Sequence, residues 1–455
     1  MAGLSHDFSV MRGRPAIALL TLFLVAPALR ADPTGKLRDL LNGNGPAALT
    51  LQAPLRQLFE KESEDESVSV PGTLTYKDAS TGGDVVFSDL EVTVRGHTSR
   101  RETECSFPKL KLKHKGAGRI RIGAHCGEEP DDKLTPKYGR LANEHSPYRE
   151  ALAYRLLAAL GVPTLRSRPA RITYVDPAAG APLTRNAMLL EDDDDAIVRL
   201  GGTREIAMEA FGDVKARGVA ADASRIAFGE ALIGNFDWCL KWAADDTYRC
   251  DQSKPLWNLL AFERGGGGTG LLMKDFDLAG IVVGGHSWLK NNFNLAFVPS
   301  KSGVELEVLL QVQRTRSLFG RAELDALRRD FMARKAAAYN ALANAPVDEA
   351  GRTIARSYLD SFYAAIGDEK SFYRPVVAKA DAHVYADAGG AKEACAAGDL
   401  VRAGTPVNVL QRSGGMSQVV LLDARWQWGT KNHCDAVVNG PVWTPSDAIT
   451  SDYPK

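Results

Sequence analysis

Two aspartates separated by one phenylalanine follow a short apolar run near the middle of the chain. The run is Leu271–Met273, and Asp275, Phe276 and Asp277 come shortly after it. If the strand continues, residues two apart face the same way, so both carboxylates point to one side and Phe276 packs on the other. Two carboxylates fixed at a strand end suit a hard cation such as Mg²⁺, whose coordination is often completed by phosphate oxygens of a substrate. Solvated or helix-capping aspartates in a turn explain the same pattern.

Two more polar residues are predicted to lie near this pair. Asp237 comes just after a helix, between two aromatic residues. Asn258 lies on a strand that Gly265–Gly268 turns back toward Asp275, which brings the amide and the carboxylate to the same end of a hairpin. Phosphoryl transfer needs one carboxylate to accept a hydroxyl proton, and an amide oxygen and a second carboxylate to hold Mg²⁺. The glycine run itself is interpreted as a hairpin turn, because no helix follows it as in phosphate-binding loops.

The elements that must position these groups can be predicted from periodicity and from turn signals. Alternating or β-branched residues predict strands at Val68–Tyr76, Asp84–Val94, Leu110–Lys115, Arg119–Ile122, Arg171–Val175, Ala187–Leu190, Leu256–Phe262 and Leu271–Lys274. Helices are predicted at Pro54–Lys61, from Ser146 to Gly161, from Asp222 to Gly234, and twice within residues 321–365. Short strands at Val376–Lys379, Pro406–Leu410 and Gln418–Leu422, with Gly/Asp turns, are typical of a small all-β barrel.

The composition is that of an ordinary globular protein. Of the 455 residues, 45% are hydrophobic and 25% are charged, and Lys plus Arg balance Asp plus Glu at 56 each. The formal net charge of zero argues against a nucleic-acid partner and against membrane attachment through a basic segment. The length allows about three domains.

The N-terminus has the features of a signal peptide. Arg12 and Arg14 precede the apolar run Ala16–Val25, and small residues follow as far as Ala31. We expect residues 1–31 to be removed and the mature protein to be periplasmic or extracellular. The apolar run is too short to span a bilayer and no later segment is a better candidate, so no transmembrane segment is expected.

The cysteines favour disulfides. Six of them form three local groups, which are Cys105 with Cys126, Cys239 with Cys250, and Cys395 with Cys434. There is no C-x-x-C motif and the neighbouring histidines are isolated, so zinc is less favoured than disulfides in an oxidising compartment. Six cysteines allow fifteen connectivities, of which we expect the nearest-neighbour one.

Several short motifs occur in a specific order across residues 68–365. They are Val94–Arg100 (VRGHTSR), the basic strand Lys109–Lys115, the helix Arg149–Gly161, Gly234–Trp238 (GNFDW) and Lys274–Asp277 (KDFD). Together with Cys105–Pro108 and the later His125-Cys126, this order resembles the CotH-type (spore-coat protein H) kinase family, especially its secreted bacterial members. The resemblance implies an atypical kinase that transfers the γ-phosphate of ATP to a Ser, Thr or Tyr hydroxyl of a protein, with Mg²⁺ or Mn²⁺.

The resemblance also implies roles for the acidic and amide residues. Asp237 matches the catalytic-loop aspartate of the family, and Asn258 matches its downstream asparagine. Asp275 matches the metal-binding aspartate, with Asp277 as its partner.

Residues that bind the nucleotide follow from the same resemblance. Glu150 would pair with a cation that binds the phosphates, and Lys111, Lys113 and Arg121 are the candidates for that cation. An arginine in this role would not be equivalent to a lysine. Glu191 falls where a hinge between two lobes would run beside adenine.

The implied fold is an α+β, two-lobed protein-kinase-like domain followed by a small β-barrel. We expect an antiparallel β-rich N-lobe with one helix at 67–191 and a mainly helical C-lobe at 192–368, after a leader at 32–66. The module at 372–455 resembles bacterial Src-homology-type barrels through its strand rhythm and Gly440–Trp443. Such barrels are associated with cell-wall binding, and a simple packing module is the alternative.

Departures from the kinase patterns leave other functions open. The chain has no G-x-G-x-x-G or H-R-D motif, Arg95–His97 replaces the usual Arg-Gly-Asn, and the Cys239–Cys250 insert lengthens the spacing from Asp237 to Asn258. A catalytically inactive kinase-like scaffold or adhesion protein of the envelope is the second hypothesis, because ATP is scarce outside the cytoplasm. A metal-dependent hydrolase that uses the same carboxylates is the third.

Other conspicuous polar residues are given ordinary structural interpretations. The acidic run Asp192–Asp195 is predicted to be a solvated loop. His97, His125 and His286 are predicted to be structural or surface residues, and no Ser-His-Asp arrangement is convincing.

Overall fold

A computed structural model describes residues 35–451, with gaps at 44, 61–67, 79–80, 97–106, 125–142, 245–249, 251–253, 287–301, 317, 378–381, 395–403 and 423–439. The chain divides into two compact units, Met1–Asp32 and Pro33–Lys455, and the described residues belong to the second. Some predictions fall on undescribed residues and stay predictions. They are the signal peptide, His97, His125, and the pairings of Cys105 with Cys126 and of Cys395 with Cys434.

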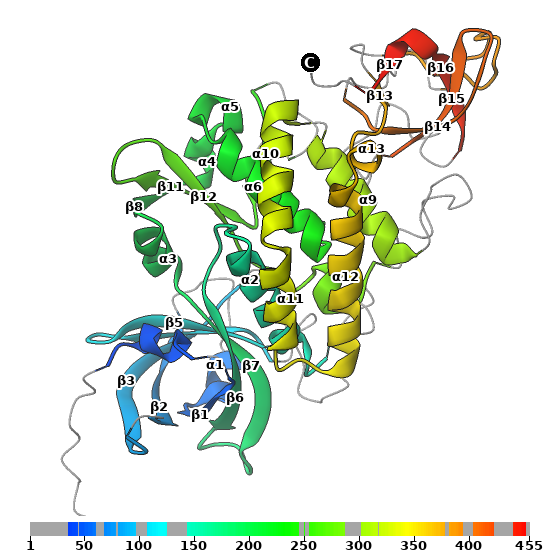
Figure 1. The fold of residues 1–455 in the computed structure, drawn as a ribbon. Coiled ribbons are helices and arrows are strands. Elements are labelled where there is room, and N and C mark those ends of the chain that lie inside the picture. The colour runs from blue at the N-terminus through cyan, green and yellow to red at the C-terminus, as the bar shows by residue number, and fades with distance from the viewer. Residues whose placement is uncertain are drawn as a thin grey trace, which may run out of the picture. The chain divides into compact units, whose positions relative to one another are not determined.

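Seven strands form a closed barrel in the N-terminal part of the described chain (Figure 1). They are β1 (Ala47–Gln52), β2 (Ser69–Lys77), β3 (Asp84–Val94), β4 (Leu110–His114), β5 (Gly118–Gly123), β6 (Ser167–Val175) and β7 (Leu183–Leu190). The order around the barrel is β1-β2-β3-β4-β5-β7-β6, and the parallel pairing of β1 with β6 closes it. Alternating apolar side chains such as Leu51, Val92 and Ile120 fill the interior.

Strand β1 corrects the sequence-based division of the chain. It lies within residues 32–66, which were predicted to be a leader outside the β-rich region, and it pairs with both β2 and β6. The 3₁₀ helix η1 (Leu37–Leu41) precedes it, and α1 (Leu55–Glu60) confirms the helix predicted at Pro54–Lys61. Six residues of alternating pattern are too few to identify a strand whose parallel partner comes much later in the chain.

Helix α2 (Ser146–Ala159) carries Glu150 and packs against β6, β7, α7 (Gly280–Val283) and α11 (Lys335–Ala343) (Figure 1). The residue at the N-cap position is His145, one residue before the predicted cap. The helix ends as predicted at Gly161, whose φ of +71° is the left-handed conformation typical of this position.

A second core lies among the helices that follow the barrel. The remaining helices are α3 (Asp193–Arg199), α4 (Met208–Phe211), α5 (Val214–Arg217), α6 (Ala220–Ile233), α9 (Gly303–Arg316), α10 (Arg321–Ala333), α12 (Glu349–Gly367) and α13 (Glu369–Phe372). Helices α6, α9 and α12 pack on one another, and Phe228 of α6 contacts the rings of Phe331 and Phe362. Residues 321–365 hold parts of three helices rather than the predicted two, because Arg334 separates α10 from α11.

The β-structure of this region carries the residues of interest. Strands β8 (Gly202–Ile206), β11 (Leu259–Arg264) and β12 (Thr269–Met273) form one sheet, and the β11–β12 hairpin turns at Gly265–Gly268 as predicted. The strand predicted at Leu256–Phe262 is interrupted at Asn258. Its first part is β10 (Leu256–Trp257), which pairs with β9 (Cys239–Leu240).

The described part of the C-terminal module is all-β, as predicted. Strands β14 (Val407–Ser413), β15 (Met416–Leu421) and β16 (Val442–Pro445) form one sheet, and β13 (Val376–Val377) pairs with β17 (Ile449–Thr450) after the short helix η6 (Ser446–Ala448). The α+β class is confirmed for the described residues. Closure of this module into a barrel, its likeness to Src-homology modules and the division into two lobes stay predictions.

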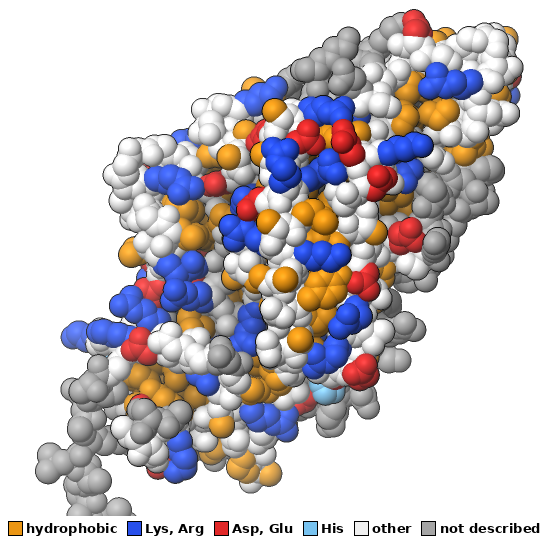
Figure 2. All heavy atoms as spheres, viewed as in Figure 1, with side chains coloured by type: hydrophobic (Ala, Val, Ile, Leu, Met, Phe, Trp, Pro, Cys, Tyr) orange, Lys and Arg blue, Asp and Glu red, His pale blue; other side chains and the backbone are white. Residues whose placement is uncertain are grey.

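The surface carries charges of both signs. Figure 2 shows Lys and Arg side chains interspersed with Asp and Glu on the visible face rather than gathered into one patch. Within the described ranges, the structure contains no helix with the length and apolar character needed to cross a membrane.

Candidate active site

The two aspartates after β12 share one buried ammonium group. Lys109 Nζ lies 3.1 Å from Asp275 Oδ1 and 2.7 Å from Asp277 Oδ2, and 6% of the Lys109 side chain is exposed. Because one nitrogen contacts both carboxylates, they point to the same side. Phe276 is fully buried and packs on the ring of Tyr154, with the centroids 4.5 Å apart.

The backbone at Asp275 does not continue the strand. Strand β12 ends at Met273, and Asp275 has a φ of +63°, which residues other than glycine rarely adopt. Its N–H donates a hydrogen bond of 2.9 Å to Tyr154 Oη. In the described part of the chain, three non-glycine residues have a positive φ, and two of them, Asn258 and Asp275, belong to this site. Such strained backbone is concentrated at functional sites in proteins.

Glu150 of α2 lies close to this cluster. Its carboxylate is buried, and Oε1 has no hydrogen-bond partner. Burial raises the pKa of Glu150 to about 7, although the nearby charge of Lys109 opposes the shift. The charges of Asp275, Asp277 and Glu150 in turn outweigh the effect of burial on Lys109 and raise its pKa. The Lys109 ammonium group is therefore positively charged, and this one cation interacts with more than one carboxylate.

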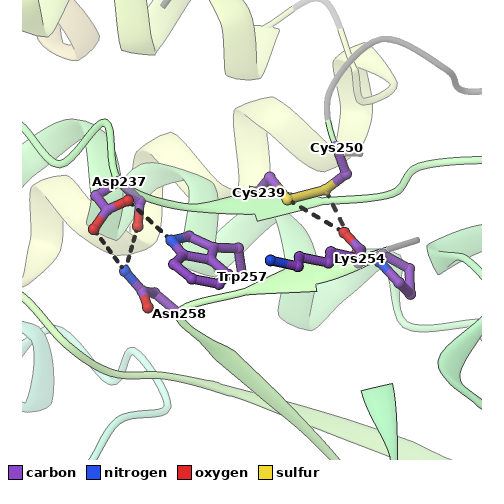
Figure 3. Close-up of a disulfide and its surroundings, with 7 residues drawn as sticks. Asp237, Cys239, Cys250, Lys254, Trp257 and Asn258 are labelled. Atoms are coloured by element: carbon purple, nitrogen blue, oxygen red, sulfur yellow. Dashed lines mark hydrogen bonds between the residues drawn. A yellow bond between two sulfur atoms is a disulfide. The ribbon is translucent and has the colours of Figure 1, made fainter. Parts of the chain in front are cut away.

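Asn258 and Trp257 hold the carboxylate of Asp237 from two directions (Figure 3). Asn258 Nδ2 donates to the backbone oxygen of Asp237 at 2.6 Å and to its Oδ2 at 3.1 Å. Trp257 Nε1 donates to Oδ1 at 2.9 Å. Because the amide nitrogen of Asn258 is used by Asp237, the amide oxygen is the atom that Asn258 can offer to a cation.

Glycine at position 234 lets the chain leave α6 directly into the Asp237 segment. Gly234 has a φ of +63°, and a Cβ there would collide with the ring of Tyr358. Its carbonyl oxygen accepts a hydrogen bond of 3.0 Å from the N–H of Gly280. This bond ties the segment after α6 to the segment after Asp277, so the two acidic segments are held together.

The two catalytic candidates have opposite pKa shifts. Burial raises the pKa of Asp237 to about 6, and the charges of Asp277 and Asp275 add to the shift, while hydrogen bonds from Trp257 and Asn258 oppose it. Burial alone would raise the pKa of Asp275 as well, but Lys109 and Arg95 together lower it. Asp237 is thus suited to exchange a proton near neutral pH, and Asp275 is suited to stay ionised.

The three cations predicted to bind phosphates lie in other ion pairs. Lys111 lies 3.6 Å from Asp192, Lys113 lies 2.9 Å from Glu91, and Arg121 lies 3.4 Å from Asp192 and 2.6 Å from Asp193. The cation that the structure places on the two site aspartates is Lys109 instead. The sequence contained a signal for it, because Lys109 is the first residue of the basic strand that carries the family resemblance. Alternation puts Lys109, Lys111 and Lys113 on one face, however, so the pattern could not distinguish among them.

The structure shows the surroundings of Glu191 and of the acidic run Asp192–Asp195, for which predictions were made from the sequence. The Glu191 carboxylate accepts hydrogen bonds from Arg199 Nη2 at 2.7 Å and from the N–H of Arg166 at 2.9 Å, so its side chain is used within the fold. The prediction of a solvated loop at Asp192–Asp195 is wrong. Asp192 is 3% exposed, and the following residues form the first turn of α3, where acidic side chains are favoured by the helix dipole.

The structure adds further residues to the site. Arg95 is close enough to influence the pKa of Lys109, Glu150 and Asp275, and Tyr154 supports the Asp275 backbone. His286 lies against Glu307, with Nδ1 and Oε2 3.0 Å apart, and has a packing role.

The donor groups fit a hard divalent cation. Asp275, Asp277 and the amide oxygen of Asn258 are the oxygen ligands that Mg²⁺ and Mn²⁺ take. The Lys109 ammonium lies between the two carboxylates, which shows that positive charge is favoured there. Among the described residues no group of three or more His, Cys, Asp or Glu side chains could hold a metal ion.

Comparisons with known proteins give remote structural matches. No protein-family model and no curated protein matches the chain. The Golgi casein kinase matches at 10% identity over 57% of this chain and 68% of that chain, with a TM-score of 0.31. The same kinase with Mn and ADP bound matches at 10% identity over 57% and 70%, also at 0.31. The Helicobacter pylori proinflammatory kinase CtkA matches at 11% identity over 56% and 87%, at 0.29. These scores are too low to carry a conclusion for this chain, and the CotH resemblance stays a prediction.

Proposed function

We propose that the protein is an exported phosphotransferase that moves the γ-phosphate of ATP to a Ser, Thr or Tyr hydroxyl of a protein. The observation that carries the proposal is the contact of Lys109 with both Asp275 and Asp277. It joins the segment before barrel strand β4 to the loop after β12. The Asp237–Asn258 pair lies at the same end of the β11–β12 hairpin, because the N–H of Lys274 donates to the backbone carbonyl oxygen of Asn258 at 3.0 Å.

Asp237 is the proposed proton acceptor for the substrate hydroxyl. Its raised pKa of about 6 leaves it ionised at neutral pH while keeping it more basic than an ordinary aspartate. The hydrogen bonds from Trp257 and Asn258 fix both carboxylate oxygens, so the proton acceptor has a defined direction.

The remaining residues bind the nucleotide in this proposal. Lys109 contacts the phosphates, and Glu150 balances its charge with an oxygen that is not otherwise hydrogen-bonded. Asn258, Asp275 and Asp277 would hold Mg²⁺ or Mn²⁺. When bound, the cation neutralises charge on the phosphate oxygens. Positioning and electrostatics then supply most of the rate.

The export part of the proposal is supported by one disulfide. Cys239 and Cys250 are bonded, as nearest-neighbour pairing predicts. Disulfides are typical of proteins that fold in an oxidising compartment. Cell-wall binding by the C-terminal module stays a prediction.

A catalytically inactive envelope scaffold is the second candidate, and one observation favours it. Lys109 contacts both carboxylates by itself, as it would in a fold that never binds a metal. In that case the two aspartates and the lysine would contribute to the structure alone.

Transfer from labelled ATP to protein, with autophosphorylation counted, distinguishes these candidates. The mature protein should incorporate label with Mg²⁺ or Mn²⁺, and Asp237→Asn and Asp275→Asn should each lower incorporation about 100-fold or more. Glu91→Gln is a matched control, because Glu91 pairs with Lys113 on the barrel surface. No incorporation with any divalent metal, together with no thermal shift on adding ATP, would support the scaffold. Release of inorganic phosphate without protein labelling would instead support the hydrolase.

A further inference from the structure

A short ribbon made of β9 and β10 lies beside Asp237 (Figure 3). Cys239 of β9 is the cross-strand partner of Trp257 in β10, and Cys239 is also bonded to Cys250. Each strand of this ribbon has two residues. Isolated two-stranded ribbons are marginally stable in water, so a covalent link beside the pair restricts where β10 can lie.

Trp257 combines exposure with a polar contact to the site. Its side chain is 38% exposed, whereas most large apolar side chains in the described chain are buried. The indole N–H donates to Asp237 Oδ1, and Lys254 Nζ lies 5.0 Å from the ring centroid. Burial therefore does not explain the position of the Trp257 ring, whereas the hydrogen bond from its indole N–H to Asp237 does.

The bond to Trp257 completes the restraint on the carboxylate. Asn258 Nδ2 holds Asp237 Oδ2, and without a donor on Oδ1 the carboxylate could rotate away from that bond. Misplacing a catalytic group by about 1 Å can cost about 100-fold in rate.

We propose that Trp257 is a positioning residue that orients the Asp237 carboxylate through its indole N–H, and that the Cys239–Cys250 disulfide holds Trp257 in place. The inference rests on the proposed function, because Asp237 is the proton acceptor there. It assigns a purpose to the insert that separates Asp237 from Asn258.

Kinetics of Trp257→Phe test the first part, because phenylalanine keeps a ring but has no N–H donor. A hydrogen bond to a charged group contributes about 1.5–3 kcal/mol, which corresponds to a loss in kcat of about 10- to 100-fold. The KM for ATP should not change, since the indole N–H bonds to Asp237, which acts on the hydroxyl substrate in this proposal. Lys254→Met is the matched control and should change neither constant, because it removes the cation over the ring and keeps the N–H. A Trp257→Phe variant with wild-type kcat would overturn the proposal.

A double-mutant comparison tests the second part. Cys239→Ser with Cys250→Ser should lower kcat by a similar factor without changing the KM for ATP. Combining these changes with Trp257→Phe should add little, because the disulfide acts through the tryptophan. Losses that multiply in the combined variant would show that the disulfide acts by another route. Serine variants are preferable to a reductant, because the chain has four other cysteines.

A readout that does not need activity separates this inference from the proposed function. The chain has seven tryptophans, so the ¹H–¹⁵N indole signal of Trp257 can be identified as the one lost in Trp257→Phe. It should shift in Asp237→Ala and in the double serine variant. A Trp257 indole signal whose chemical shifts are unchanged in both variants would overturn the inference even if the enzyme is active. A signal that shifts as expected in a protein that transfers no phosphate would overturn the proposed function and leave the hydrogen bond established.

Discussion

Two clusters of ion pairs join the barrel to the chain that follows it, and they differ in how their charges are balanced. In the first, the Lys109 cluster, Lys109 contacts Asp275 and Asp277, and Glu150 lies close by. In the second, the α3 cluster, Asp192–Asp195 are paired with Lys111, Arg119, Arg121, Lys274 and Arg38.

The difference separates a site from a structural junction. In the Lys109 cluster carboxylates outnumber the paired lysine, and Asp275 has a left-handed backbone. In the α3 cluster five cations pair with four acids, and the acids lie at a helix N-terminus that itself favours negative charge. An excess of negative charge favours a divalent cation, which can in turn hold the phosphate oxygens of a nucleotide, whereas a cluster whose acids are all paired does not favour one.

The largest expected effect comes from removing the cation of each cluster in turn. Lys109→Met should lower phosphate transfer by about 100- to 1000-fold, the size of effect seen when one preorganised electrostatic contact is lost. Lys111→Met, on the same strand face, should leave transfer nearly unchanged, because its partner Asp192 keeps Arg119 and Arg121. Initial rates with labelled ATP measure both. Equal losses in the two variants would remove the distinction between the clusters.

The next effect concerns stability. Asp192→Asn should lower the free energy of unfolding by about 2–3 kcal/mol, because it removes the acid that pairs with Lys111 and one of the two acids that pair with Arg121. Asp275→Asn should cost less, because Lys109 keeps Asp277 as its partner. Urea unfolding of both variants checks the order. A less stable Asp275→Asn would show that the Lys109 cluster is the structural one.

A smaller effect is expected from pH. Asp237 accepts a proton only when ionised, and its pKa is about 6, so kcat should fall as pH drops through 6. The charges of Arg121 and Lys274 outweigh burial and lower the pKa of Asp193 in the folded protein. The stability that ionised Asp193 contributes is therefore fully present above the ordinary pKa of an aspartate, and it is lost only as pH falls below that value. Between pH 7 and 5 activity should therefore decline while the melting temperature shows no loss from the α3 cluster. A parallel decline in both would contradict this separation.

The smallest effect should come from the rim of the α3 cluster. Arg38 and Asp195 lie 3.5 Å apart, and the Arg38 side chain is 59% exposed. Exposed pairs contribute about 0–1 kcal/mol, so Arg38→Gln should change unfolding by about 0.5 kcal/mol or less at physiological salt. A change of several kcal/mol in the same urea assay would mean that the cluster extends to the surface.

Helices and strands were predicted well where the apolar residues recur with a clear helical or strand period. The strand at Asp84–Val94 was placed to the residue, and the helices that start near Ser146 and Asp222 end at the predicted glycines. The hairpin was also predicted, because a glycine turn links two apolar strands, and the structure supplies its register. That register is what places Asn258 beside Asp275.

What the sequence could not predict has physical causes. Finding which lysine of the basic strand contacts the site aspartates requires knowing where the strand begins relative to its partners, which pattern alone does not give. The acidic run was interpreted as solvated because its partners, Lys111 and Arg121, come from strands far away in the sequence. Likewise, the break at Asn258 depends on its left-handed backbone, which the surrounding apolar residues conceal.

Barrel closure has a consequence for how the chain folds. The closing pair aligns Ala47 with Ala170, whereas β2 with β3 and β4 with β5 are joined by short connections. Local hairpins form within microseconds, but strands this distant must first overcome the entropy of closing a long loop. The barrel therefore stays open, with the β1 and β6 edges that face each other unpaired, until these two strands meet. Unpaired strand edges bind the edges of other molecules, so slowed folding should lead to aggregation before it leads to loss of the site.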